Sequence, residues 1–276
     1  MSFGRLMAIG GAAGPDLLAR FVALTGGPAA AIVVVAVASA QPDELEARYV
    51  SAFAELGAGA VHPLRLDSRA AANEVPALLE SATGVFFTGG DQQRIVTTIG
   101  GTRTDSVLQR LVISGRVLLG GTSAGAAMMS GTMIVGGDGY AVTTGPGLEF
   151  LPGVLIDMHF AERGRLNRLL AAVARYPHEL GLGIDEDTAI LVEGDRFEVL
   201  GSGSVTVVDA GAATDIRAAQ TAPPHCAKCG VDAPAGGPIA LAGARLHVLP
   251  AGCTFELSSR RPSIADAPAG ERGRAA

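Results

Sequence analysis

A serine between closely spaced glycines is the residue of this sequence that most directly suggests chemistry. Residues 120–127 read Gly-Gly-Thr-Ser-Ala-Gly-Ala-Ala and follow the short apolar run Val117–Leu119. A strand, then Gly-x-Ser-x-Gly, then a helix is the pattern of a nucleophile elbow, in which a tight turn exposes the serine hydroxyl. The motif therefore predicts Ser123 as the nucleophile of a hydrolase. A glycine-rich turn that only packs is the alternative.

A serine nucleophile needs a base, and the sequence offers five histidines. His159 ends the apolar run that begins at Val154, at the edge where open α/β sheets hold their sites. Asp157 lies two residues earlier and so points to the same side of the strand. Arginine side chains follow that can bind a substrate carboxylate through paired hydrogen bonds: Arg163, Arg165 and Arg168. The alternative is a capped strand end followed by solvated arginines. This alternative readily explains any single residue of the group, but it explains less well why the histidine, the aspartate and the arginines occur together.

Further loops fall where strands are expected to end. Residues 88–92, Thr-Gly-Gly-Asp-Gln, can supply an oxyanion amide from Gly90. The acidic turn in residues 183–188, Gly-Ile-Asp-Glu-Asp-Thr, can supply the carboxylate that orients the base. Plain turns are the alternative for both. The Gly10–Gly14 loop does not match a dinucleotide fingerprint, and no acidic residue is well placed to bind a ribose.

Composition argues against several classes of function. The chain has 276 residues, a formal net charge of −6 and no tryptophan, which argues against a nucleic-acid partner. Lys228 is the only lysine, so a Schiff-base mechanism has almost no candidate. Cys226 and Cys229 follow His225 like half of a zinc site, but no second half is evident, and we expect neither a metal nor a cofactor. The longest apolar stretch, Ala29–Ala38, is too short to cross a bilayer and no signal peptide is visible, so we expect a cytoplasmic protein without a membrane partner.

Strands and helices are expected to alternate over the first two thirds of the chain, which predicts an α/β fold with a parallel sheet and helices on both faces. The expected strands cover residues 5–9, 31–38, 61–66, 85–88, 117–119 and 154–159. The expected helices cover residues 15–24, 42–56, 74–82, 92–99, 105–113 and 162–175, and a hairpin covers 132–144. From residue 183 onward, short strands at 189–192, 197–200, 205–208, 239–241 and 245–249 predict a small C-terminal β layer. We expect one catalytic domain over residues 1–257 and a disordered tail over 258–276.

Four segments together resemble the cyanophycinases, serine exopeptidases of peptidase family S51 that are related to aspartyl dipeptidase. In the family's order they are Phe87–Gln92, Gly121–Ala126, Asp157–Phe160 with Arg163–Leu169, and Gly183–Ala189. The resemblance implies a flavodoxin-like fold akin to class I glutamine amidotransferases, usually as a homodimer. The substrate that it implies is a poly-aspartate backbone carrying arginine on its β-carboxyls, released as β-Asp-Arg dipeptides.

The resemblance also implies roles for individual residues. Ser123 is implied as the nucleophile, His159 as the general base and Glu186 as the acid that orients the base. The amides of Gly90 and Ala124 are the implied oxyanion donors. The implied substrate-binding residues are Gln92, Asp157, Arg163, Arg165 and Arg168.

The sequence departs from the family's pattern beside the histidine, where Met158 stands in place of the usual glutamine. A thioether cannot replace the donors and acceptor of an amide, so a hydrogen bond to the substrate is expected to be lost. Related dipeptidases are assigned an aspartate between the serine and the histidine, which makes Asp138 the alternative to Glu186.

The sequence thus predicts a serine peptidase acting on β-aspartyl or similar isopeptide linkages. One alternative is an α/β-hydrolase-type esterase, whose histidine near the C-terminus would be His247. The other is a non-catalytic protein that binds a ligand containing aspartate or arginine.

Overall fold

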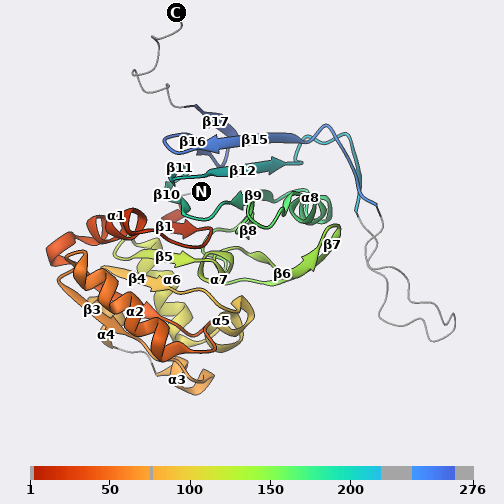
Figure 1. Cartoon of the computed structure of the whole chain (residues 1–276). Helices are drawn as coiled ribbons and strands as arrows, with labels where there is room; N and C mark the ends of the chain where they lie inside the picture. The colour runs from red at the N-terminus through yellow and green to blue at the C-terminus, as the bar shows by residue number, and fades with distance from the viewer. Residues whose placement is uncertain (1–2, 75–76, 219–237, 265–276) are drawn as a thin grey trace, which may run out of the picture.

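A large twisted sheet forms the centre of the molecule. In this computed structural model, which describes residues 3–74, 77–218 and 238–264, the sheet has nine strands in the order β17-β16-β11-β10-β1-β5-β4-β2-β3 (Figure 1). Its parallel part consists of β1 (Phe3–Ile9), β2 (Ala31–Val35), β3 (Ala60–Pro63), β4 (Gly84–Phe87) and β5 (Leu118–Thr122). Its antiparallel part consists of β10 (Thr188–Gly194), β11 (Arg196–Gly201), β16 (Thr254–Glu256) and β17 (Arg261–Ser263).

Helices cover both faces of the parallel part. On one face, α1 (Pro15–Thr25) and α2 (Pro42–Glu55) bury aromatic side chains such as Phe21 and Phe53 against the strands, and the short 3-10 helix η1 (Gly27–Ala29) follows α1. The other face is covered by α3 (Arg69–Asn73), α4 (Ala77–Ser81), α5 (Gln92–Ile99) and α6 (Arg103–Ile113). Across the described ranges, no helix combines the length and the apolar character needed to cross a membrane. This arrangement confirms the predicted α/β fold.

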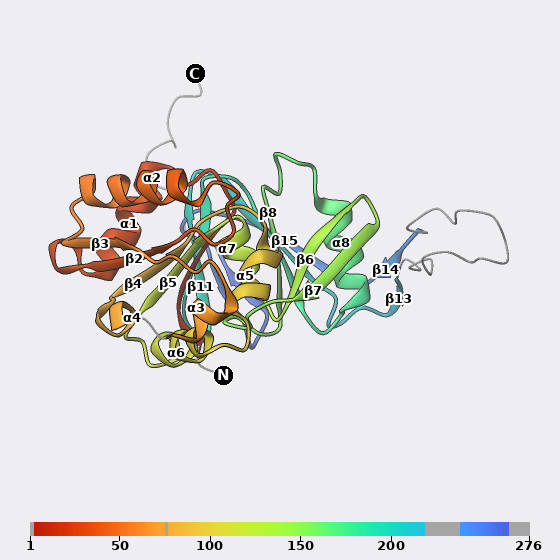
Figure 2. The same ribbon diagram turned by 90° about the horizontal axis from the view of Figure 1, so that it is seen from below.

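A second sheet lies beside the first, in the order β15-β12-β9-β8. Its strands are β8 (Val154–Met158), β9 (Leu180–Ile184), β12 (Ser204–Asp209) and β15 (Arg245–Pro250). One face packs on the main body, and α8 (Leu166–Arg175) covers the other. Figure 2 shows α8 alongside the hairpin of β6 (Thr132–Asp138) and β7 (Ala141–Pro146), on the side away from α1 and α2. A small pair, β13 (Asp215–Arg217) and β14 (Ala240–Ala242), adjoins α8.

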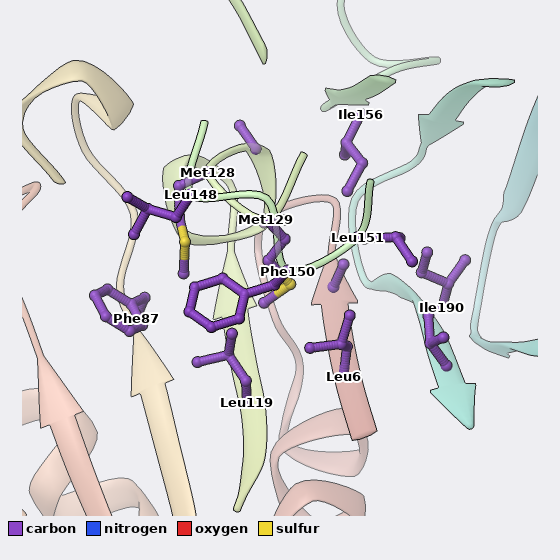
Figure 3. Close-up of a cluster of buried hydrophobic side chains, with 14 of the residues drawn as sticks. Leu6, Phe87, Leu119, Met128, Met129, Leu148, Phe150, Leu151, Ile156 and Ile190 are labelled. Atoms are coloured by element: carbon purple, nitrogen blue, oxygen red, sulfur yellow. The ribbon is translucent and has the colours of Figure 1, made fainter. Parts of the chain in front are cut away.

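The two sheets share one hydrophobic core. Leu6 of β1 and Leu119 of β5 belong to one buried cluster with Met129, just after α7 (Ala124–Ala127), and Phe150, in the loop before β8. Ile156 of the second sheet belongs to the same cluster (Figure 3). All of these side chains are buried. The nucleophile elbow and the strand that leads to His159 are therefore held in one packed unit.

Several element boundaries differ from the sequence prediction for identifiable reasons. Strand β9 was not predicted because alternate positions are glycines, yet a Cβ on Gly181 would lie 2.5 Å from Val173 of α8 and one on Gly183 would lie 2.4 Å from the Phe160 ring. Helix α8 begins at Leu166 rather than at residue 162, because Gly164 has a φ of 59°, which a right-handed helix excludes.

Two other predicted elements have different bounds. The expected helix over 74–82 is replaced by α3 and α4, on either side of Pro76 in the sequence, a residue that a helix interior does not accommodate. The expected strand over 117–119 continues to Thr122, through two glycines. A Cβ on Gly120 would lie 2.5 Å from the Phe21 ring, so the glycine makes room for the aromatic core.

The ordered chain also extends past the predicted domain boundary at residue 257. Strand β17 pairs with β16, so the prediction of a disordered tail from residue 258 is wrong for residues 258–264, and residues 265–276 lie outside the described part. Arg260 accounts for this order. Its guanidinium donates to Asp209 Oδ1 at 2.5 Å and to the carbonyl of His178 at 2.6 Å, and the Asp209 carboxylate is buried. This ion pair ties the end of the main sheet to the second sheet.

Replacing Arg260 with glutamine is expected to lower the free energy of unfolding by about 1.5–3 kcal/mol. The buried Asp209 carboxylate loses its hydrogen-bonded guanidinium and keeps the more distant Arg245, at 4.0 Å. The matched control is Arg261→Gln, which changes an exposed arginine one residue further on and is expected to cost less than about 0.5 kcal/mol. Urea unfolding followed by circular dichroism measures both. Equal losses in the two variants would contradict the stabilising role of the Arg260–Asp209 pair.

Candidate active site

Ser123 lies in a strained turn between β5 and α7. Its φ of 53° and ψ of −110° are unusual for a residue with a side chain, and its amide donates to the carbonyl of Ile9 at 2.9 Å. The glycines of the motif allow the turn: a Cβ on Gly121 would lie 2.3 Å from the carbonyl oxygen of Gly125, and one on Gly125 would lie 2.3 Å from that of Phe87. The sequence therefore folds into the predicted elbow.

His159 comes to Ser123 from the second sheet. It follows β8, has a φ of 51°, and donates its backbone N–H to the carbonyl of Gly10 in the main sheet's first loop, at 2.8 Å. Its Nε2 lies 2.9 Å from Ser123 Oγ. The structure thus brings together a serine and a histidine that are 36 residues apart in the chain.

Glu186 completes a line of three side chains. Its Oε1 lies 2.5 Å from His159 Nδ1. Because a carboxylate only accepts, the hydrogen belongs on Nδ1, which leaves Nε2 as the acceptor for the serine hydroxyl. This is the spatial order of a serine–histidine–carboxylate triad. The side chain of Asp138, the alternative acid, lies outside the part that the structure describes.

The Gly10–Gly14 loop is the part of the site that sequence reasoning missed. Gly11 has a φ of 142°, and a Cβ there would lie 2.2 Å from His159 Cε1. A Cβ on Gly10 would lie 2.2 Å from the carbonyl oxygen of Asp185. The backbone of this loop therefore packs directly against the His159 imidazole. The run of glycines indicated that another segment packs closely against this loop, but nothing in the sequence showed which segment it is.

Two backbone amides beside Ser123 have no acceptor among the described residues, those of Gly90 and Ala124. Gly90 has a φ of 142°, and a Cβ there would lie 2.2 Å from the carbonyl oxygen of Ala38. Its neighbour Gly89 lies against Ser123, since a Cβ there would be 3.5 Å from the serine Cβ. Free amides next to a serine hydroxyl are the donors that an oxyanion hole needs.

A buried cluster of charges lies two residues before His159. Asp157 is 0% exposed, and both of its carboxylate oxygens accept from Arg168, with Nε donating to Oδ2 at 2.9 Å. Arg165 donates to Asp157 Oδ1 at 3.4 Å and to the carbonyl of Met158. Burial, together with the charge of Arg168, lowers the pKa of the Arg165 guanidinium. The three groups carry a net charge of +1, with Asp157 and Arg168 buried and Arg165 partly exposed.

The remaining residues predicted to bind substrate lie in different settings. Arg163 is exposed in the loop between His159 and α8. Gln92, at the start of α5, donates to the carbonyl of Ile134 in β6 at 2.8 Å. Met158 is 5% exposed and belongs to the hydrophobic core between the sheets, because it points to the opposite side of β8 from Asp157.

Other candidates lie away from this line or outside the described part. His247 is on β15 of the second sheet, paired with Val207, and its buried Nε2 has no hydrogen-bond partner within the described part of the chain. Within residues 3–74, 77–218 and 238–264, no group of three or more His, Cys, Asp or Glu side chains is placed to hold a metal ion. Cys226 and Cys229 lie outside these ranges.

Similarity to known proteins identifies this chain as a peptidase. The chain belongs to peptidase family S51, whose model matches residues 6–200. This finding confirms the resemblance that the four sequence segments predicted.

Curated relatives make the placement within the family more specific. A cyanophycinase from Nostoc sp. is 37% identical over 268 residues, covering 92% of this chain and 86% of that protein. A cyanophycinase from Geminocystis herdmanii is 36% identical over 270 residues, covering 93% and 95%. The crystal structure of a peptidase from an acI-B1 Actinobacterium superposes with a TM-score of 0.60 at 20% identity, covering 76% of this chain and 92% of that one, which shows a shared fold.

Replacing Gly11 with alanine is expected to slow the labelling of Ser123 by a serine-reactive phosphonate about 100-fold, because the new methyl group displaces the His159 ring. Gly115→Ala is the control: it also adds a Cβ at a positive φ, 72°, but meets no atom within 4 Å. Labelling followed by mass spectrometry measures both rates. An unchanged rate in Gly11→Ala would contradict the contact between the loop and the ring.

Proposed function

We propose that this peptidase is a cyanophycinase-like serine exopeptidase that releases β-Asp-Arg dipeptides from an arginine-bearing poly-aspartate. The observation that carries the proposal is the line from Ser123 through His159 to Glu186, with distances of 2.9 and 2.5 Å, in a chain similar to cyanophycinases over most of its length. The free amides of Gly90 and Ala124 lie beside Ser123, and the arginines follow His159 in the chain.

The proposed reaction is acyl transfer in two steps. His159 Nε2 takes the proton from Ser123 Oγ, which attacks the carbonyl carbon of the scissile bond. The imidazolium that forms is stabilised by Glu186, and the amides of Gly90 and Ala124 donate to the oxyanion. His159 then gives the proton to the leaving amine as the C–N bond breaks. Water, deprotonated by His159, attacks the acyl-enzyme, and the proton returns to Ser123 as the product acid leaves.

The charges support an acidic substrate. Arg163 is exposed and Arg165 is partly exposed, so both can meet a carboxylate of the substrate, and Asp157 holds Arg165 and the buried Arg168 in fixed directions. Because Asp157 is buried, we assign it to holding the arginines rather than to touching substrate. The Nε2 of Gln92 donates to the carbonyl of Ile134, and its Oε1 can accept from a substrate N–H group.

Met158 bears on which substrate the enzyme prefers. Its side chain packs in the core, so the amide contact expected from the family's glutamine is replaced by apolar packing. The substrate is therefore best tested with cyanophycin beside a panel of β-aspartyl dipeptides, with products identified by mass spectrometry. The homodimer and the cytoplasmic location stay predictions; light scattering on the purified protein tests the dimer.

Ser123→Ala is expected to lower kcat on cyanophycin or β-aspartyl peptides by a factor of about 10⁶, because the acyl-enzyme cannot form. Its thermal unfolding is expected to match that of the parent, since the change removes one hydroxyl. Turnover that survives unchanged in this variant would rule out the serine mechanism. Binding without turnover in the parent protein, with no phosphonate labelling, would instead favour the non-catalytic alternative.

A histidine pair separates the peptidase from the esterase alternative. His159→Ala is expected to lower kcat about as strongly as Ser123→Ala, since the two residues act as a unit. His247→Ala is expected to leave kcat within about 3-fold of the parent, because His247 lies on β15, away from the line of three side chains. Steady-state kinetics on the same substrate panel measure both. The reverse pattern would favour the esterase alternative.

A further inference from the structure

The turn that carries Glu186 is also the point where the chain passes from one sheet to the other. Strand β9 ends at Ile184 in the second sheet, and β10 begins at Thr188 in the main sheet. Only residues 185–187 lie between them. The direction of the Glu186 side chain is therefore set by how this crossing is held.

Asp185 holds the crossing on the side of the second sheet. It is buried, and its Oδ1 accepts from the backbone N–H of Ala161 at 3.1 Å. Its Oδ2 accepts from both the backbone N–H and the hydroxyl of Ser204, at 3.0 and 2.9 Å. Ala161 lies two residues after His159, and Ser204 begins β12. This carboxylate thus joins the turn to the loop that bears the histidine.

Asp187 holds the crossing on the side of the main sheet. Its Oδ1 accepts from the backbone N–H of Gly14 at 2.8 Å, and its Oδ2 accepts from the Ser202 hydroxyl at 3.0 Å. Its own amide donates to the carbonyl of Gly11 at 2.9 Å. It has a φ of 47°, which aspartate tolerates better than most residues. Gly11 is the glycine against which the His159 ring lies.

Several acidic side chains lie close together at this turn, and each accepts hydrogen bonds from different groups. Besides Asp185 and Asp187, the carboxylate of Glu162 lies close, accepting the backbone N–H of Glu186 at 3.2 Å. Each of these three carboxylates faces an N–H or O–H group. Only the Glu186 carboxylate faces the imidazole.

We propose that Asp185 and Asp187 are positioning residues, which fix Glu186 against His159 Nδ1 without touching substrate or the reacting atoms. The proposal rests on the proposed function, in which Glu186 orients the base. Because the two aspartates act through Glu186 and not on the substrate, their loss lowers kcat and leaves KM nearly unchanged.

Asp187→Gly tests the inference, because glycine tolerates the positive φ and the change removes the side chain with its carboxylate. Its kcat falls about 10- to 100-fold and its KM stays within about 2-fold. Asp187→Asn, whose amide oxygen still accepts from Gly14, retains kcat within about 5-fold. The matched control is Asp195→Gly, at the other end of β10, where the carboxylate accepts from Ser258; it leaves kcat within about 2-fold. A loss in Asp187→Asn as large as in Asp187→Gly, or an equal loss in the control, overturns the proposal.

A double-mutant cycle with Glu186→Gln separates this inference from the proposed function. In the Glu186→Gln background, Asp187→Gly lowers kcat by less than about 3-fold, since the group that it positions is already disabled. A full loss in that background overturns the inference alone. If Glu186→Gln itself leaves kcat unchanged, the acid of the proposed mechanism is wrong, and the inference falls with it. If Asp187→Gly does not fold, Ser202→Ala, which removes one donor to Asp187, replaces it in the same cycle, and additive effects or no effect overturn the inference.

Discussion

The backbone contact between the Gly10 carbonyl and the His159 amide is the interaction on which the site depends. Ser123 stands on the main sheet and His159 on the second, so the 2.9 Å between their side chains reflects how the two sheets are docked. A hydrogen bond of 2.8 Å and a glycine without a Cβ under the imidazole set that distance directly. The shared core then keeps the sheets from sliding, because a close-packed interior resists displacement of its side chains.

Charge is arranged around this junction so that little of it is unpaired. Asp157 neutralises one of two neighbouring guanidinium groups, and a buried carboxylate without such partners would be unfavourable. One positive charge remains in excess, and hydrogen bonds to Asp157 fix the orientation of both guanidinium groups. In the proposed function, this arrangement would attract an anionic group of the substrate and orient it.

Most of the fold could be predicted from the sequence, and so could the proximity of Ser123, His159 and Glu186, because strand ends in an α/β sheet lie together at one edge. Ser123, His159 and Glu186 each follow a strand, and the resemblance of four segments to one family, in the family's order, implied their roles. What could not be predicted depends on contacts between distant segments. Strand β9 was hidden by glycines that are needed only because α8 and Phe160 lie above them. The role of Gly11 could not be predicted either, because it depends on contact with the distant His159 ring. The burial of Asp157 depends on α8, which carries Arg168 and packs over the sheet that contains β8.

The hairpin of β6 and β7 supplies acceptors to two of the residues that we propose to bind substrate. Gln92 donates to the carbonyl of Ile134, and Arg168 donates to that of Gly137 at 3.3 Å. A ligand that takes these N–H groups exchanges one acceptor for another, so the hydrogen bonds add little net affinity. They discriminate instead, since a molecule lacking an acceptor at the right place would leave a donor unsatisfied. Under the proposed function, a substrate would compete with the hairpin carbonyls for these two donors.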